Sequence, residues 1–204
     1  MERVIPTPSL PVGSIGSSPP GYVGMICLIL TEASVFVYLE FSYYYFAVEP
    51  HAGGTFPAGG PPSMQLSLPN TIILLLSSVA VWWGERGIRQ GSVRQLNWGL
   101  GLGIVFGLIF IMVQAKEWAN KTFTIASNLY GSNFFTTTGF HLAHVSAGVL
   151  MLIALFIWSL RGYFDNMRNT YVSIGALYWH FVDAVWLTLF FTFYLSPRLG
   201  VGQS

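Results

Sequence analysis

The sequence predicts an integral membrane protein, an all-α bundle of five transmembrane helices. Hydrophobic residues make up 53% of the 204 residues, and charged residues only 8%. A water-soluble domain carries roughly 25% charged residues, so this chain cannot cover itself with a water-facing surface. Five apolar segments come close to the roughly 20 residues that a helix needs to cross the hydrocarbon core. Aromatic residues reach 16%, and their rings suit membrane interfaces.

The predicted spans follow one another from the N-terminal third of the chain to its end. Residues 1–21 are rich in Pro, Ser and Gly and lack the apolar core of a signal peptide, so we expect a flexible arm. Gly/Pro-rich or polar segments separate the spans because they cannot continue a helix in lipid. The five-helix domain is expected over 22–196, with spans at about 22–48, 68–84, 96–118, 131–160 and 171–196, and a short tail over 197–204.

The basic residues predict how the bundle is oriented. With five spans, the N-terminal arm, the second loop and the fourth loop share one side of the membrane. Cytoplasmic loops carry an excess of Lys and Arg, so we predict a cytoplasmic N-terminus and a C-terminus on the outer, periplasmic side. Six basic residues fall on the first side (Arg3, Arg86, Arg89, Arg94, Arg161, Arg168) and three on the second (Lys116, Lys121, Arg198).

Several function classes do not fit the composition. A net charge of +1 provides no basic field for nucleic acid. The single cysteine, Cys27, can form neither an intrachain disulfide nor a cysteine-based metal site. Glycines in the third span, Gly103 and Gly107 among them, and Gly139 with Ala143 and Ala147 in the fourth are spaced for close helix packing.

Titratable side chains inside the spans are the candidate functional residues. Each costs about 2.5–3.5 kcal/mol on insertion scales, so we expect it to face the bundle interior and to have a partner. A spacing of three places His141 with His144, and His180 with Asp183, on one helix face. The full set is Glu32, Glu40, Glu117, His141, His144, His180 and Asp183.

Four roles remain open for these side chains from the residues alone. Imidazole and carboxylate groups are suitable metal ligands. Acids and histidines can also form a proton relay across a membrane. They could instead hold lipid head groups or a partner subunit. The role we favour is an interhelical hydrogen-bond network that fixes the register of the bundle.

Several sequence stretches resemble one known family. The fifth span reads YWHFVDAVW over 178–186, and the fourth contains Thr138-Gly139-Phe140-His141 followed by His144. Asn70-Thr71 opens the second span, Thr31-Glu32 lies in the first, and Gln114, Glu117 and Trp118 end the third. These stretches resemble subunit III of the haem–copper oxidases, the cytochrome c oxidase subunit III family, over roughly Tyr22–Leu195.

The resemblance implies a non-catalytic, metal-free subunit of a proton-pumping terminal respiratory oxidase, which reduces oxygen to water. Such a subunit packs on subunit I, binds phospholipid and supports proton uptake, while haem and copper belong to partner subunits. Subunit II and a respiratory supercomplex are further expected partners. The expected location is the plasma membrane of a bacterium, with the mitochondrial inner membrane less favoured. The alternatives are subunit III of a quinol oxidase and, in a different class, a stand-alone transporter or channel.

The resemblance also implies roles for particular residues. Glu32 matches a buried acid related to proton movement, and Arg161 is expected to contact a lipid phosphate. No catalytic residue and no metal site are expected in this chain. The interhelical polar network is expected to comprise His141, His144, His180, Asp183 and Glu117.

The chain departs from the family pattern in three places. The longest members have seven spans, whereas five are predicted here. Leu142 stands where the family usually has glycine, which puts close packing at that point in doubt. Glu40 has no family counterpart.

Overall fold

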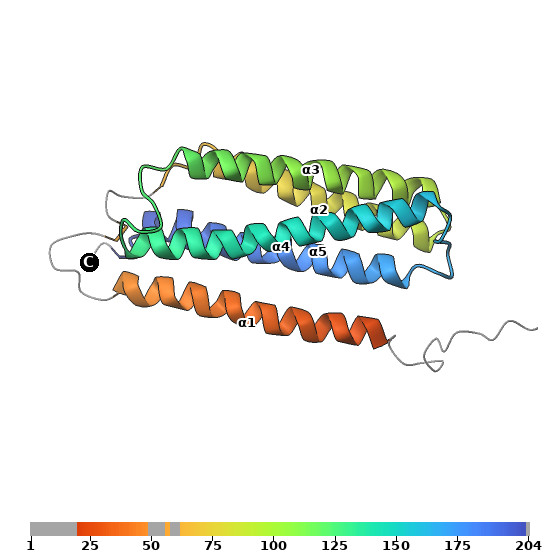
Figure 1. Ribbon diagram of the computed structural model, residues 1–204, viewed down its shortest axis with the longest axis horizontal. Helices are drawn as coiled ribbons and strands as arrows, with labels where there is room; N and C mark the ends of the chain where they lie inside the picture. Colours follow the sequence, from red (N-terminus) through yellow and green to blue (C-terminus); the bar gives the residue numbers. More distant parts are fainter. Residues whose placement is uncertain (1–19, 49–55, 58–61, 203–204) are drawn as a thin grey trace, which may run out of the picture.

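The computed structural model describes residues 20–48, 56–57 and 62–202. Within them, five helices are long and apolar enough to cross a membrane. They alternate in direction along the chain (Figure 1). This architecture confirms the predicted all-α, five-span fold class. The helices are α1 (Pro20–Val48), α2 (Ser67–Arg89), α3 (Val93–Ala119), α4 (Leu129–Leu160) and α5 (Thr170–Phe190).

Helix α2 is longer at its C-terminal end than the apolar pattern predicts. The expected span stopped at residue 84, but the helix continues to Arg89, and α3 begins at Val93. Glu85 and Arg89 form an i, i+4 pair at 2.5 Å, which supports a helix beyond its apolar part. The turn closes through Gly91, at φ 83°, and the side chain of Ser92, which caps α3 by accepting from the Gln95 amide. Gly91 thus supplies the left-handed conformation that the tight turn needs.

The fifth span changes its helical type near its end. It runs as an α-helix to Phe190, then as a π-helix over Phe191–Leu195, and then as a 3-10 turn over Ser196–Leu199. Pro197 has no backbone N–H to donate, so the regular ladder cannot continue through it. The Ser196 hydroxyl instead donates to the Thr192 carbonyl at 2.6 Å. Residues 1–19 of the predicted arm and 203–204 of the predicted tail lie outside the described residues.

Small residues allow the core helices to approach closely. A Cβ added to Gly99 would lie 2.6 Å from both the Ala80 carbonyl oxygen and the Gly84 Cα, so α2 and α3 touch backbone to backbone there. On α4 the close approach falls at Gly148, where an added Cβ would meet the Trp179 ring at 2.8 Å. At Gly139, which we expected to allow close packing, the nearest atom would be at an ordinary 3.6 Å.

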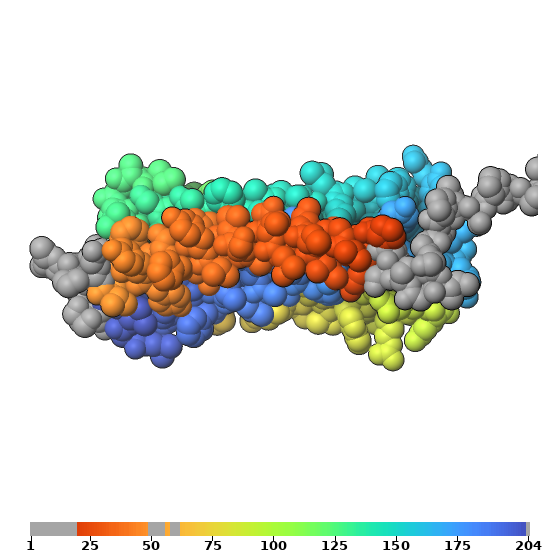
Figure 2. Space-filling view, turned by 90° about the horizontal axis from the view of Figure 1, so that it is seen from below, coloured from red at the N-terminus to blue at the C-terminus, as the bar shows by residue number. Residues whose placement is uncertain are grey.

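Helix α1 lies on the outside of the bundle. In the most apolar part of α1 only 6% of the residues are buried, against 56% in the last span. Figure 2 shows α1 lying along one face, with α4 on one side of it and α5 on the other. Phe36, Tyr43 and Ala47 are its buried contacts. Its outer face exposes apolar side chains that water would not favour, among them Val37, Tyr38, Phe41 and Val48.

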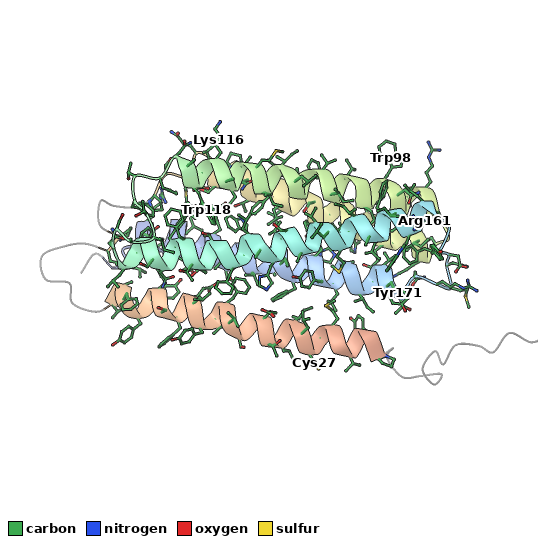
Figure 3. The ribbon with its side chains drawn as sticks, viewed as in Figure 1. Cys27, Trp98, Lys116, Trp118, Arg161 and Tyr171 are labelled. Carbon is green, nitrogen blue, oxygen red and sulfur yellow. The ribbon has the colours of Figure 1, made fainter. Side chains whose placement is uncertain are left out.

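The two ends of the bundle differ in charge. The α2–α3 turn, the α4–α5 loop and the start of α1 lie at the same end (Figure 1). Figure 3 places Arg161 at this end and Lys116 at the opposite one. The separation follows the predicted distribution of basic residues. The cytoplasmic position of the N-terminus depends on this charge difference and stays a prediction.

The α2–α3 contact can be tested with Gly99→Ala. The added methyl group would meet backbone atoms, which cannot move aside as the end of a side chain can, and we expect a loss of about 1–3 kcal/mol. Thermal unfolding of the purified protein in detergent measures the loss. Gly101→Ala on the same helix is the control, because its nearest neighbour would be the Phe156 ring at 3.9 Å. Equal unfolding temperatures for the two variants would contradict the contact.

Candidate functional site

A carboxylate and an imidazole join the outer helix α1 to the bundle. Oε2 of Glu32 lies 3.2 Å from Nε2 of His144 on α4. The Glu32 side chain is 36% exposed and that of His144 is 16% exposed. The Phe36 ring packs edge-on against the His144 ring, with 5.1 Å between their centroids. The pair therefore lies at the side of the bundle, open to whatever covers α1.

The contacts of His144 limit where a proton on its ring can lie. Nδ1 lies 2.7 Å from the Phe140 carbonyl oxygen, which can only accept, so Nδ1 carries a proton. The contact between Nε2 and Glu32 then requires one proton, carried either by the carboxyl group or by the ring. In the first case both groups are neutral, and in the second they form an ion pair. The geometry thus suits a proton that moves between the two side chains.

His141 lies deeper, surrounded by aromatic rings. It is 1% exposed, stacks on Trp186 with 5.0 Å between centroids, and meets the edge of Phe110 at 5.8 Å. Neither ring nitrogen has a hydrogen-bond partner among the described residues. His141 and His144 share the neighbour Phe36, as their spacing on one face predicts. Their partners, however, are different.

His180 and Asp183 face α2. Nδ1 of His180 lies 3.2 Å from the Ser78 hydroxyl, and Asp183 lies beside the same hydroxyl. Trp179, next in sequence, donates from its indole nitrogen to Ser77 at 3.1 Å. This cluster links α5 to α2, and its hydrogen bonds involve neither Glu32 nor His144.

Glu117 belongs to a third cluster, at the end of α3. Its Oε1 accepts from Lys121 Nζ at 2.9 Å and from the Tyr194 hydroxyl at 2.5 Å. The side chains of Glu117 and Lys121 are only 4% and 10% exposed. The Lys121 ammonium also lies over the rings of Phe134 and Tyr194, at 5.0 and 5.3 Å. The predicted network is thus divided into separate clusters rather than one connected set.

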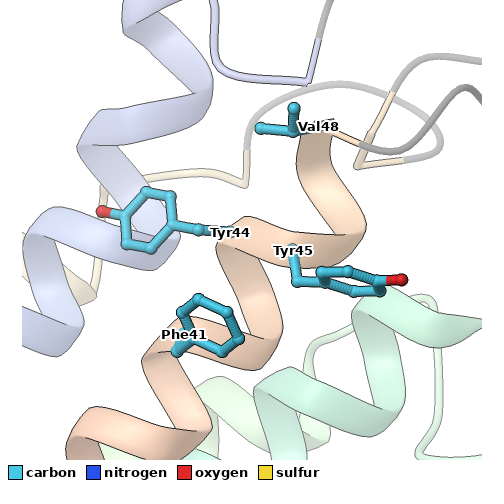
Figure 4. A pocket seen from close by; sticks show the side chains of 4 residues that line it. All are labelled: Phe41, Tyr44, Tyr45 and Val48. Carbon is cyan, nitrogen blue, oxygen red and sulfur yellow. The ribbon is translucent and has the colours of Figure 1, made fainter.

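Glu40 has a partner that the sequence did not indicate. Its Oε1 accepts from the Thr188 hydroxyl at 2.5 Å, and the neighbouring Tyr44 hydroxyl lies 3.2 Å from that of Thr192. Glu40 thus joins α1 to α5, whereas Glu32 joins α1 to α4. Just beyond it, Phe41, Tyr44, Tyr45 and Val48 line a shallow apolar hollow (Figure 4). The cost of an acid in a membrane span led us to expect a partner for Glu40 in the bundle, but nothing in the sequence pointed to Thr188.

Arg161 closes α4 as its C-cap residue and is exposed. Tyr171 lies at the same end of the bundle (Figure 3). The centroid of its ring is 6.5 Å from that of Trp158, which precedes Arg161 on α4. A cation beside such rings marks the level of the membrane interface. Among the described residues, no group of three or more His, Cys, Asp or Glu side chains could hold a metal ion.

The fold and these clusters define a class of protein, a helical multi-pass membrane protein whose titratable groups are paired between helices. Residues 21–197 match the family model described as cytochrome c oxidase subunit III. The chain is 36% identical over 176 residues to "Cytochrome c oxidase subunit 3" of Equus caballus and to that of Drosophila melanogaster, and 35% to that of Osphranter robustus. Each comparison covers 84% of this chain and 67% of the relative. The chain belongs to the cytochrome c oxidase subunit III family.

The position of Glu32 predicts its reactivity. A hydrophobic carboxyl-selective reagent in the membrane should label Glu32, which is 36% exposed, and not Glu117, which is 4% exposed and held by Lys121. Mass spectrometry of digested protein locates the label. Glu32→Gln should remove the label from this position and leave any label at Glu40, which serves as an internal control. Labelling of Glu117 in preference to Glu32 would refute the assigned exposure.

Proposed function

We propose that this chain is the non-catalytic subunit III of a proton-pumping terminal oxidase that reduces oxygen to water. The family match over residues 21–197 is the observation that carries the proposal. In this role the chain packs on the catalytic subunit I and stabilises it, in a complex that also contains subunit II. Haem and copper are bound by those partners.

The apolar surface of α1 and of the outer faces of α2 and α3 supports a subunit role. Large hydrophobic side chains such as Trp82, Trp98 and Tyr38 are at least half exposed. In a membrane these faces are covered by lipid or by helices of a partner, and association there depends on packing rather than on water exclusion. We therefore propose direct contact with subunit I through one of these faces. Membership of a respiratory supercomplex is a further proposal.

Glu32 and His144 support a part in proton uptake. Oε2 of Glu32 and Nε2 of His144 lie 3.2 Å apart, within hydrogen-bonding distance, and the pair lies at the open side of α1. We propose that they exchange protons with groups at the complex surface rather than carry out chemistry on oxygen. The labelling experiment on Glu32 tests the access that this role requires. We further propose a bacterial plasma membrane as the location, with the loops rich in arginine in the cytoplasm.

Purification of the complex tests the proposed function. The chain, tagged at its C-terminus and isolated gently from its native membrane, should bring with it haem absorbance and oxygen consumption. Reduced cytochrome c should support that consumption, and a quinol substrate is the alternative donor to compare. An unrelated multi-pass protein carrying the same tag is the control. Isolation of the chain without any haem protein would refute the proposal.

Phospholipid binding at Arg161 is part of the proposal. Its exposed guanidinium lies at the interface end of α4 and can hold a phosphate with two parallel hydrogen bonds. A lipid held there would lie between the aromatic residues of the same end and the arginine. Such binding would anchor the end of α4 beside α5.

Native mass spectrometry of the complex tests this contact. Arg161→Ala should lose one bound phospholipid that the unchanged protein retains, and Arg161→Lys should retain it weakly, because an ammonium cannot form the paired bonds. Arg168→Ala, in the same loop, is the matched control and should keep the full set. If Arg161→Ala retained the same number of bound phospholipids, the proposed contact would be wrong.

A further inference from the structure

Four buried polar side chains of α2, α3 and α4 have atoms without a hydrogen-bond partner among the described residues. They are Asn70 on α2, Gln114 and Glu117 on α3, and His141 on α4, and they are 0%, 1%, 3% and 1% exposed. The atoms without a hydrogen-bond partner are Asn70 Oδ1, Gln114 Oε1 and Nε2, Glu117 Oε2, and His141 Nδ1 and Nε2. Buried polar groups are almost always paired with protein or ordered water. Six such atoms in one region of a bundle therefore need a physical account.

Contacts between α2 and α3 place three of these residues together. Nδ2 of Asn70 donates to the Phe110 carbonyl oxygen at 3.3 Å, which sets the register of the two helices. Gln114 is one turn beyond Phe110, and Glu117 is nearly one turn further. Phe110, Gln114 and Glu117 all belong to the buried stripe of α3, so their side chains point to the same side of that helix. The free oxygen of Asn70 thus lies beside the turn that carries Gln114.

Contacts between α3 and α4 bring His141 to the same level. These helices run antiparallel, and Trp118 packs on Phe135 with 5.6 Å between ring centroids. Further along the pair, a Cβ added to Gly107 would touch Val149. Between these two points, the turn with Gln114 lies opposite the turn with His141. The His141 ring also meets that of Phe110, one turn away from Gln114, at 5.8 Å.

One carboxylate oxygen of Glu117 is bonded by the end of the fifth span and by Lys121, and the other is without a partner. The π-helix over Phe191–Leu195 carries Tyr194, whose hydroxyl donates to Oε1 of Glu117. Lys121 donates to the same Oε1, so Oε2 remains without a partner. Because the Lys121 ammonium neutralises the Glu117 carboxylate, the region has no net negative charge to attract a cation. A ligand here must be neutral, small, and able both to donate and to accept hydrogen bonds.

We propose that Asn70, Gln114, Glu117 and His141 enclose an internal water site of about two molecules. A buried water makes about three hydrogen bonds, so two would satisfy the six free atoms. Such waters accept from the Gln114 amide and the protonated His141 nitrogen, and they donate to the free oxygens and the other ring nitrogen. The site gives a hydrogen-bonded connection from Lys121, through Glu117 and Gln114, to His141 within the membrane. It is separate from the Glu32–His144 pair at the side of the bundle.

Density for ordered water in the intact oxidase complex tests the site. A map that resolves waters elsewhere inside this chain should show at least one peak within about 3.2 Å of both Gln114 and either His141 or Glu117. No peak there, with Gln114 bonded directly to His141, would overturn the proposal. A peak surrounded by oxygens at about 2.3–2.6 Å would overturn it too, because that spacing belongs to a bound cation.

Gln114→Met gives a second test. The direction in which it shifts the unfolding temperature distinguishes a site with bound water from one without. With bound water, methionine removes the bridge and leaves the free atoms of Glu117 and His141 without partners, so unfolding of the chain within the complex should shift down by about 2–4 °C. Without water, methionine removes an unpaired amide, and the temperature should stay or rise. Ile111→Met on the same helix controls for the fit of methionine. If Gln114→Met does not assemble, the water density in the unchanged complex decides.

Discussion

The indole of Trp179 is the contact on which the packing of the bundle depends. It belongs to α5, its nitrogen donates to the Ser77 hydroxyl on α2, and its ring lies against Gly107 on α3 and Gly148 on α4. A single side chain, 1% exposed, therefore touches all four core helices. Any side chain at either glycine would occupy the space of the ring. The Trp179 ring therefore requires glycine at both 107 and 148. The distances of α3 and α4 from α5 follow from this packing.

Around that centre the polar groups serve different pairs of helices. Trp179, His180 and Asp183 connect α5 to α2 through two adjacent serines, Ser77 and Ser78. Each interhelical bond of this kind contributes only about 0.6 kcal/mol in a membrane. Their value lies in specificity, because a serine hydroxyl satisfies its partner in one register only. Packing at the glycines then supplies the stability that these bonds do not.

Helix α1 is held in a different way from the other four. Its outward face is apolar and exposed. Its polar ties to the core include the two acids, Glu32 to His144 and Glu40 to Thr188, and aromatic contacts around Tyr43 add to them. Polar bonds at the boundary with lipid are more accessible than those on the bundle axis. The same helix is thus the least buried and the one that carries the accessible carboxylates.

The sequence predicted the features that depend on composition and local spacing. Apolar length predicted five spans, and the spacing of three placed His180 and Asp183 on one side of α5, where both face Ser78. It did not predict the partners, because Ser77, Ser78 and Thr188 are ordinary residues whose role depends on the rotation of one helix against another. Nor did it predict that His141 and His144 would have different surroundings, which depends on where α1 crosses α4.

The end of the fifth span shows most clearly where local pattern stops being sufficient. Apolar residues continue to Leu195, so the pattern predicts one uninterrupted helix. Pro197 prevents that ladder from continuing, and the wider π turn brings Tyr194 to Glu117 while the Arg198 guanidinium donates to the Tyr194 carbonyl. π turns inside helices occur often at functional sites because they redirect one side chain without breaking the helix. Here the redirected side chain is that of Tyr194, whose hydroxyl donates to the buried carboxylate of Glu117. The proline and the buried acid on α3 are therefore two parts of the same arrangement, although 80 residues separate them in the sequence.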